Sequence, residues 1–290
     1  MRSARALAHR QGLPHLTLDL RDEFRAGVVD PWLAGHAAGV TPNPCVRCNG
    51  AVRIDAMLDL AERVGAAALA TGHYARVGSD GLLRAAVDDA KDQTYMLAGL
   101  APSSLARMRF PLGELTKPDV RDIAERAGLP VARHPDSQDL CFLAGTGRAA
   151  FLERHGQIRA RRGAVLDPAG TEVGRHDGAH GYTVGQRRGV GVDGADEPLY
   201  VLATDVAANT VTVAPRAALE RHRVRVADLQ LHVPESEVQA VKLRYRSRAL
   251  ACTLRGEDLE LHEPAWAAAP GQTAVFLAGD RVLGTATISG

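Results

Sequence analysis

The pattern of apolar residues changes near Gly163, and this change limits the folds that the chain can adopt. Before Gly163, stretches with helical spacing such as 52–64 alternate with short apolar runs such as 66–70. The run at 66–70 is typical of a buried strand in a parallel sheet. After Gly163, short β-type runs are separated by Gly, Pro, Asp and Asn up to the end of the chain. The sequence therefore predicts an α/β domain followed by β-rich domains.

The same change predicts how the chain divides into domains. We place one boundary near residue 146 and a second near residue 222. This gives an α/β domain over 1–145, a small central domain over 146–222 and a C-terminal β-barrel over 223–290. Because 46% of the 290 residues are hydrophobic, the chain has ample apolar surface for a buried core.

Composition excludes several classes of protein. The net charge is +1, so contact with nucleic acid has to come from local clusters of cations. The apolar runs fall far short of the roughly 20 residues that cross a membrane, and the N-terminus has no apolar signal-peptide core. Four cysteines do not form a disulfide framework in a chain of this length. We therefore expect a cytoplasmic protein with no membrane partner, in which any disulfide is transient and functional.

Three local elements are predicted in the α/β region. Residues 13–20 alternate polar residues with leucines, which predicts a strand. Residues 21–38 predict a helix that is interrupted near Pro31. Thr116 and Asp119 have the spacing of a capping box, which predicts the start of another helix.

The stretch TPNPCVRCN contains the first candidates for chemistry. Its two prolines and its asparagine predict a rigid, turn-rich loop, and Gly50 is expected to break the chain after it. Cys45 and Cys48 are spaced Cys-x-x-Cys, and Arg47 beside Cys48 is expected to favour the nucleophilic thiolate. We expect the rest of the chain to bring a substrate and a second sulfur, that of Cys141, to Cys48.

Two other roles remain open for this Cys-x-x-Cys pair. A zinc site needs four ligands, but Cys141 and Cys252 are isolated and no histidine pair follows at finger spacing, so we expect no structural metal. A thioredoxin-like redox motif starts a helix after a strand, which fits poorly with the prolines before the pair. Cys141, between Leu140 and Phe142, is either a buried structural thiol or, given its polar lead-in HPDSQD, a functional one.

Three further polar stretches are candidates for binding. His73 follows the run 66–70, at the position where open α/β sheets bind ligands, although a surface histidine would give the same pattern. The polar run DDAKDQ at 88–93 is typical of a helix N-terminus. The glycine-rich run GYTVGQRRGVG at 181–191 either approaches a phosphate backbone or forms a solvated turn.

The cations Lys242, Arg244, Arg246 and Arg248 alternate with other residues. On a strand, this period of two would point all four to one face. Such a row either follows an RNA backbone or protects an edge strand from aggregation. We favour RNA, because four cations exceed what edge protection needs.

Six motifs, taken in order, resemble those of the tRNA-specific 2-thiouridylases, ATP-dependent enzymes that place sulfur on the wobble uridine of certain tRNAs. They are TPNPCVRCN, ATGHYARV, KDQTYML, DSQDLCFL, GYTVGQRRGVGV and VKLRYRS, and the match extends from about Leu13 to the C-terminus. The resemblance implies an adenylating α/β domain of the PP-loop ATP pyrophosphatase type, a central domain and a C-terminal β-barrel. It also implies ATP with Mg²⁺ as cofactors, and tRNA and a sulfur-donor protein as partners.

The resemblance also implies roles for individual residues. The family's nucleophile falls on Cys48, its sulfur-carrying cysteine on Cys141 and an ATP-contacting glycine on Gly72. Positions that contact tRNA fall on Asn43, Pro44, Cys45, His73, Lys91, Asp92, Gln93, Arg244, Tyr245 and Gln272.

The reaction implied by the resemblance uses both cysteines. ATP converts the uridine oxygen into a leaving group, and Cys141 receives sulfur as a persulfide. Either Cys48 attacks that persulfide and frees sulfide, or the persulfide attacks the base directly. Both routes need the two thiols within disulfide reach, and a cytosolic reductant then resets them.

The sequence departs from the family pattern in two places. Many members have an aspartate at the position of Cys45, where a thiol titrates much higher, and a Cys45–Cys48 disulfide would be a dead end. The family's Ser-Gly-Gly-x-Asp-Ser phosphate loop does not occur in this sequence. We therefore expect a thiouridylase whose sequence as given starts too late to include that loop. The alternatives are an inactive tRNA-binding fragment and a zinc or redox protein.

Overall fold

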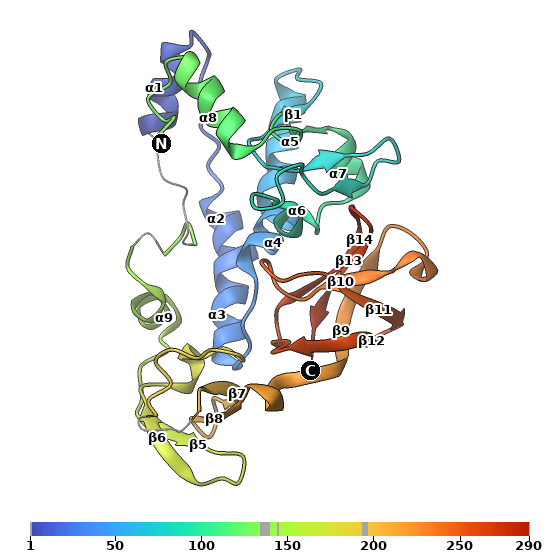
Figure 1. Ribbon diagram of the computed structural model, residues 1–290. Helices are drawn as coiled ribbons and strands as arrows, with labels where there is room; N and C mark the ends of the chain where they lie inside the picture. The colour runs from blue at the N-terminus through green and yellow to red at the C-terminus, as the bar shows by residue number, and fades with distance from the viewer. Residues whose placement is uncertain (1, 134–139, 144, 193–196, 290) are drawn as a thin grey trace.

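The structure is a computed structural model that describes residues 2–133, 140–143, 145–192 and 197–289 (Figure 1). Residues 136–139, the first part of the DSQDLCFL motif, lie outside these ranges. In Figure 1 the N-terminal helices are blue and green, the central region is yellow and the C-terminal barrel is orange and red. No helix in the described ranges combines the length and apolar content needed to cross a bilayer.

The N-terminal region is mainly helical. Its helices are α1 (Arg2–Arg10), α2 (Arg21–Phe24), α3 (Asp30–Ala37), α4 (Pro44–Cys48), α5 (Ile54–Arg63), α6 (Thr94–Leu97), α7 (Pro102–Ala106) and α8 (Lys117–Arg126), with π-helical segments η1 (Arg25–Val29) and η2 (Asn49–Arg53). Its strands are β1 (Leu69–Ala70), β2 (Arg76–Val77), β3 (Leu83–Arg84) and β4 (Met108–Arg109). Strand β1 pairs in parallel with β4, and β2 pairs with β3 as a hairpin. The predicted capping box of Thr116 and Asp119 is confirmed at the start of α8.

The central region packs a small sheet beside one helix. Its elements are α9 (Arg148–Gly156), β5 (Gly163–Leu166), β6 (Glu172–His176), η3 (Ala179–Gly181), β7 (Leu199–Asp205), β8 (Thr210–Pro215) and η4 (Arg216–Leu219). The four strands pair in the order β6-β5-β8-β7. The side chains of Val165, Val201, Val211 and Val213 form the core of this sheet.

The C-terminal region is a barrel. Its elements are β9 (Glu220–Leu231), η5 (Glu235–Glu237), β10 (Ala240–Lys242), β11 (Leu250–Arg255), β12 (Asp258–Trp266), β13 (Thr273–Ala278) and β14 (Arg281–Ile288). Six strands of the described chain pair in the order β13-β10-β11-β12-β9-β14, and the pairing of β13 with β14 closes the barrel. Closure leaves few unpaired backbone groups at the edges.

Strand β13 attaches the barrel to the N-terminal helices. Its side chains alternate, so Ala274 and Phe276 point into the barrel core while Val275 and Leu277 pack against the helical core. The hairpin of β2 and β3 adds to the same sheet through the pairing of Arg84 with Arg281 in β14. The barrel is therefore held against the region that contains α4 and α5.

Two predicted strands differ from the structure. Residues 13–20 are irregular, and the prediction of a strand there is wrong. Leu13 and Leu16 are 54% and 66% exposed, and among the described residues no strand pairs with this segment. An alternating pattern cannot form a strand without a partner for its backbone groups. Strand β1 covers only the last two residues of the run 66–70, and Ala70 is exposed rather than buried.

Gly50 does not break the chain as predicted. Helix α4 continues through η2 into α5, so one helix extends over residues 44–63. A Cβ atom at Gly50 would lie 2.7 Å from the backbone oxygen of Gly99. The glycine is needed here for close packing against another backbone rather than for a turn. The interruption predicted near Pro31 takes the form of the π-helical segment η1, after which α3 begins.

This packing makes Gly50→Ala a test of the helix position. Alanine has the higher helix propensity, by about 1 kcal/mol, so an isolated helix would gain stability. We expect the protein instead to lose about 1–3 kcal/mol in the free energy of unfolding, because the new methyl group collides with Gly99. Urea unfolding of the full chain measures this, with the exposed neighbour Ala51→Ser as the control. A gain in stability for Gly50→Ala would contradict the packing.

Candidate active site

Three cysteines from two distant segments line one pocket of about 310 Å³, which we call the cysteine pocket. Cys45 and Cys48 come from α4, and Cys141 comes from the segment 140–143. The other lining residues are Phe24, Val28, Pro44, Asn49, Arg53, His73, Gln93, Met96, Leu140 and Phe142. The three thiols are free, so the pocket brings together the two predicted catalytic cysteines in their reduced form.

Asn43 and Pro44 start a helix rather than a loop, which corrects the prediction for this stretch. The side-chain oxygen of Asn43 accepts hydrogen bonds from the backbone N–H groups of Cys45 at 3.1 Å and Val46 at 3.4 Å. Pro44 occupies the first turn, where its missing N–H costs nothing. Cys45 and Cys48 are therefore three residues apart on a helix and lie on one side of it.

Arg47 points away from the thiols. Its Nε donates a hydrogen bond of 2.6 Å to the backbone oxygen of Gly27. Gly27 lies in the π-helical segment η1, so this hydrogen bond ties Arg47, and with it α4, to the preceding helix.

Arg53 is the cation that faces the cysteine pocket. Its Nη2 donates to Asn49 Oδ1 at 2.7 Å and contacts His73 Nε2 at 3.2 Å. Because arginine cannot accept, we assign His73 the neutral tautomer, with Nε2 accepting and Nδ1–H donating to Thr71 Oγ1 at 2.8 Å. Burial, assisted by the Arg53 charge, lowers the pKa of His73 to about 4. His73 therefore stays neutral and oriented at neutral pH.

The thiols are not activated in the way that the sequence predicts. Burial raises the pKa of Cys48, the nearby Cys141 charge raises it further, and Arg53 opposes both effects. Burial also raises the pKa of Cys45, followed by the charges of Cys141 and Cys48, and Arg53 again opposes. The expectation that Arg47 favours a Cys48 thiolate is therefore wrong, since the arginine that lowers the thiol pKa is Arg53.

Aromatic side chains hold Cys141 at the mouth of the pocket. Cys141 is exposed, but its neighbour Phe142 packs against Trp32 and Phe151 with ring centroids 5.3 and 5.1 Å apart. Leu140 belongs to the same apolar cluster. Of the two roles open for Cys141, the structure thus favours an accessible thiol on a fixed backbone over a buried structural one.

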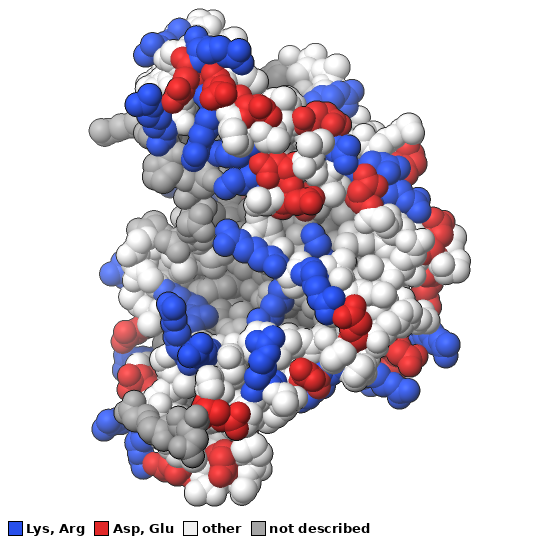
Figure 2. All heavy atoms as spheres, viewed as in Figure 1, with Lys and Arg blue, Asp and Glu red and all other residues white. Residues whose placement is uncertain are grey.

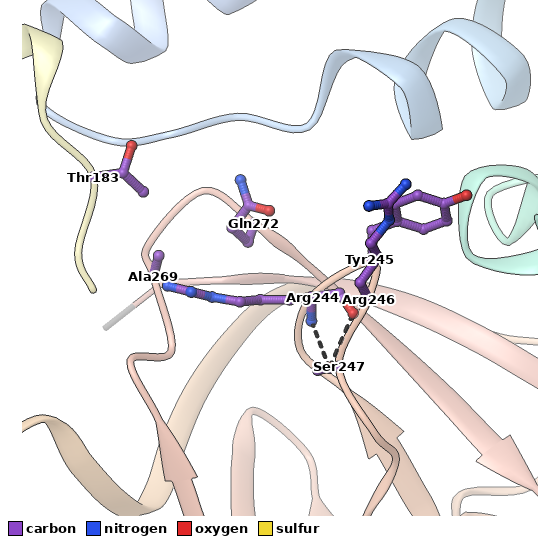
Figure 3. Close-up of a pocket in the computed structure, with 7 residues that line it drawn as sticks. All are labelled: Thr183, Arg244, Tyr245, Arg246, Ser247, Ala269 and Gln272. Atoms are coloured by element: carbon purple, nitrogen blue, oxygen red, sulfur yellow. Dashed lines mark hydrogen bonds between the residues drawn. The ribbon is translucent and has the colours of Figure 1, made fainter. Parts of the chain in front are cut away.

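A second pocket, of about 490 Å³, lies beside the barrel, and we call it the barrel pocket (Figure 3). It is lined by Thr183, Arg244, Tyr245, Arg246, Ser247, Ala269 and Gln272. Three predicted tRNA contacts, Arg244, Tyr245 and Gln272, therefore meet in one place. Figure 3 shows that Arg246 and Tyr245 lie together at one side of this pocket, with the Arg246 guanidinium 5.8 Å from the ring centre.

Two of these three residues also hold neighbouring regions together. Gln272 Nε2 donates to the backbone oxygen of Thr41 at 2.5 Å, and the Thr41 N–H donates to the oxygen of Pro270 at 3.1 Å. Arg244 Nη2 donates to the backbone oxygen of Val184 at 2.6 Å, and burial lowers the pKa of its guanidinium. The segment before α4, the central region and the barrel therefore meet at the barrel pocket.

The predicted row of cations on one strand is wrong. Strand β10 ends at Lys242, and the backbone turns at Arg244, whose oxygen accepts from the N–H of Ser247 at 3.1 Å and from its hydroxyl at 2.9 Å. A serine hydroxyl that bonds to nearby backbone favours a turn over a strand. Arg248 forms two hydrogen bonds with Glu263, of 3.2 and 2.6 Å. The four cations therefore do not share one face.

The other predicted contacts occupy a connected loop. Asp92 accepts from Ala86 N–H at 3.0 Å and Thr94 Oγ1 at 2.6 Å, while Gln93 Oε1 accepts from Tyr74 N–H at 3.0 Å. The run 88–93 precedes α6 instead of forming its first turn. The N–H of Lys91 donates to the backbone oxygen of Asp88 at 3.0 Å in a turn that precedes α6. Gln93 also lines the cysteine pocket.

Arg53 was not identified from the sequence, although a signal was present. It lies four residues after Asn49, a spacing that brings side chains together on a helix. The sequence predicts a chain break at Gly50, between Asn49 and Arg53. It therefore does not predict that these two residues lie on one helix.

Figure 2 shows a hollow in the middle of this face of the molecule, with Lys and Arg side chains around it. Acidic side chains lie mainly toward the rim of the view. A near-neutral chain can therefore still present a local concentration of positive charge.

Three family models match the chain in succession. They are the tRNA methyl transferase HUP domain over residues 1–145, the tRNA methyl transferase PRC-barrel domain over 149–215 and the aminomethyltransferase β-barrel domain over 221–288. These matches and the closed barrel confirm the predicted fold class of an α/β domain, a central domain and a C-terminal β-barrel.

Curated relatives match over nearly the whole chain. The tRNA-specific 2-thiouridylase MnmA of Acidithiobacillus ferrooxidans is 44% identical over 99% of this chain and 85% of its own length. The protein of the same name from Synechococcus sp. is 42% identical over 98% of this chain and 83% of its own length. That from Thermus thermophilus is 42% identical over 98% of this chain and 78% of its own length.

Replacing Arg53 tests which cation acts on the thiols. We expect Arg53→Gln to raise the thiol pKa values of Cys45 and Cys48 further, because the positive charge that opposes the effect of burial is lost. Alkylation at neutral pH should slow severalfold, with the pH dependence of the rate shifted upward. Mass spectrometry of the iodoacetamide-labelled chain measures the rate at each cysteine. Arg47→Gln is the control, and an equal shift in both variants would contradict the assignment.

Proposed function

The chain belongs to the tRNA-specific 2-thiouridylase family, and we propose that it transfers sulfur to the wobble uridine of tRNA in an ATP-dependent reaction. Cys48 is the nucleophile and Cys141 carries the sulfur as a persulfide. The observation that carries this proposal is the meeting of these two cysteines in one pocket, from segments far apart in the sequence. An inactive tRNA-binding fragment would have no need of that arrangement.

Exposure and burial suit the two cysteines to different tasks. Cys141 is exposed at the mouth of the pocket, where a sulfur-donor protein can reach it. Cys48 is partly buried beside Arg53, where a substrate entering the pocket would lie over it. A persulfide on Cys141 then reaches the pocket without a large movement of the anchored Phe142.

The transfer balances with the two thiols alone once the base is activated. The outer sulfur of the Cys141 persulfide bonds to C2 of the activated uridine as the C2–O bond breaks and AMP leaves, and Cys48 attacks the inner sulfur of Cys141. The persulfide S–S bond breaks and leaves sulfur on the base, while a Cys48–Cys141 disulfide forms. In the alternative order, Cys48 attacks first and releases sulfide, which then attacks the base. Both orders require two electrons from an external thiol before the next cycle.

ATP supplies the activation, since a uridine oxygen is a poor leaving group. Gly72, the predicted ATP contact, is exposed after β1, and a Cβ built there meets only Leu112 Cδ1 at 3.8 Å. ATP use rests on the HUP-domain match, Mg²⁺ remains an expectation from the resemblance, and no residue is assigned to the activation step.

The predicted tRNA contacts divide between the two pockets. Pro44, Cys45, His73 and Gln93 line the cysteine pocket, and Arg244, Tyr245 and Gln272 line the barrel pocket. Asn43, Lys91 and Asp92 adjoin the first set along the chain. The backbone oxygen of Thr41, two residues before Asn43, accepts a hydrogen bond from Gln272 and so connects the two sets of residues. An anticodon stem-loop that contacts both pockets would bring its phosphates to the arginines of the barrel pocket and a splayed base to Cys48.

Domain boundaries near 146 and 222 remain part of this proposal. A cytoplasmic location follows from a reaction that needs tRNA and a thiol reductant. The sulfur donor is proposed from the persulfide chemistry, since Cys141 has to be reloaded after each cycle.

Serine substitutions test the roles of the cysteines. We expect Cys48→Ser and Cys141→Ser each to lower tRNA thiolation about a thousandfold or more, because each removes a reacting sulfur. Thiouridine is measured by mass spectrometry of digested tRNA after incubation with ATP and a persulfide-generating desulfurase. Cys252→Ser, in the barrel core, is the control.

Isotope labelling separates the two roles. With ³⁵S-cysteine and the desulfurase, Cys48→Ser should retain label on Cys141, whereas Cys141→Ser should carry none. Full thiolation by Cys141→Ser would contradict the proposed carrier role.

Two arginines of one turn test the RNA surface. Arg246 is exposed and lines the barrel pocket, whereas Arg248 is not one of the residues that line it. We expect Arg246→Gln to weaken tRNA binding and to reduce the slope of log affinity against log salt by about 1. Arg248→Gln should change that slope much less. Filter binding over a range of KCl concentrations measures both, and equal slopes for all three proteins would oppose binding at this pocket.

A further inference from the structure

Cys45 lies in the same pocket as Cys48 and Cys141 but has no part in the sulfur transfer proposed above. It is partly buried, it is free, and it is three residues from Cys48 on the same helix. Side chains at this spacing are neighbours, with Cβ atoms about 5–6 Å apart. Val46 between them is buried and Arg47 is exposed, so both thiols face the pocket from one side of the helix.

We propose that Cys45 is the thiol that resolves the Cys48–Cys141 disulfide after each sulfur transfer. The inference rests on the proposed function, since that disulfide is its substrate. It gives Cys45 a chemical role in the reaction cycle and makes the Cys45–Cys48 disulfide an intermediate rather than a dead end.

The exchange balances without a further reactant. The Cys45 thiolate attacks Cys48 Sγ, a Cys45–Cys48 bond forms, and the Cys48–Cys141 bond breaks to release the Cys141 thiolate. An external dithiol then reduces the Cys45–Cys48 disulfide and takes up its two electrons as a disulfide of its own. Cys141, the exposed thiol, is thus available for reloading before reduction is complete.

Electrostatics favours the exchange at the right stage. In the reduced pocket, burial and then the charges of Cys141 and Cys48 raise the pKa of Cys45. Formation of the Cys48–Cys141 disulfide removes both of those charges, while Arg53, which lowers the pKa of Cys45, stays in place. Cys45 therefore becomes a better nucleophile when its target disulfide exists.

Tryptic digestion can identify each disulfide directly. Cleavage after arginine places the three cysteines on three different peptides, 26–47, 48–53 and 134–148. The reduced full-length chain is oxidised with diamide, quenched with acid at intervals, alkylated, digested and analysed by mass spectrometry without reduction. Cys252→Ser serves as the matched control, because Cys252 is buried in the barrel core.

We expect the 48–53/134–148 link to form first in the wild type and then to fall as the 26–47/48–53 link rises. In Cys45→Ser, the 48–53/134–148 link should persist. A wild type that keeps this link and does not form the 26–47/48–53 link would overturn the role of Cys45 while supporting the proposed function. Absence of the 48–53/134–148 link even in Cys45→Ser would overturn the pairing of Cys48 with Cys141, and the inference with it.

Turnover separates a chemical role from a structural one. With thioredoxin as the only reductant, Cys45→Ser should thiolate tRNA about tenfold more slowly than the wild type under steady-state conditions. Added dithiothreitol should restore the rate, because a small dithiol reaches the Cys48–Cys141 disulfide directly. A loss that dithiothreitol does not restore would show that Cys45 acts on structure, and an unchanged rate with thioredoxin would also refute the proposal.

Discussion

The hydrogen bonds at the backbone of Thr41 connect the parts on which the active site depends. Its N–H group donates to Pro270 and its carbonyl accepts from Gln272, so the segment before α4 is held by the barrel at both polar groups. Its hydroxyl donates to Thr183 of the central region at 3.1 Å. Because Asn43 caps α4 two residues later, the direction of α4 is set at this junction. The segment before α4 is consequently tied to Gln272, which lines the barrel pocket, and leads into Pro44 and Cys45, which line the cysteine pocket.

Inside the cysteine pocket, one arginine acts on several groups. Arg53 holds Asn49 and His73 by hydrogen bonds and lowers the pKa values of Cys45 and Cys48 against the effect of burial. A partly buried thiol with a raised pKa reacts slowly until its surroundings change. Cys45 and Cys48 are thus weakly reactive in the reduced pocket. A bound substrate or a new disulfide would alter the balance of charge around them.

The sequence predicted the architecture better than the local geometry. The capping box of Thr116 is a purely local signal, and it was found where expected. The strand over 13–20 failed because pairing needs a neighbour that a local pattern does not show. The sequence predicts a chain break at Gly50, but the small size of this residue serves contact with Gly99, which is distant in the sequence. The row of cations from Lys242 failed because Ser247 closes a turn on Arg244.

The sequence by itself determined the change from helical to β patterning, the order of the motifs and the cysteines available for chemistry, because these are properties of residue type and spacing along the chain. Tertiary structure decided which residues face those cysteines. The backbone oxygen of Gly27 binds Arg47 on the outside of the pocket, and the unbroken helix through Gly50 brings Arg53 to the pocket instead. Such contacts depend on how distant segments pack. Backbone hydrogen bonds and burial across the whole fold therefore place Arg53 near the thiols, although Arg47 is the arginine adjacent to Cys48 in the sequence.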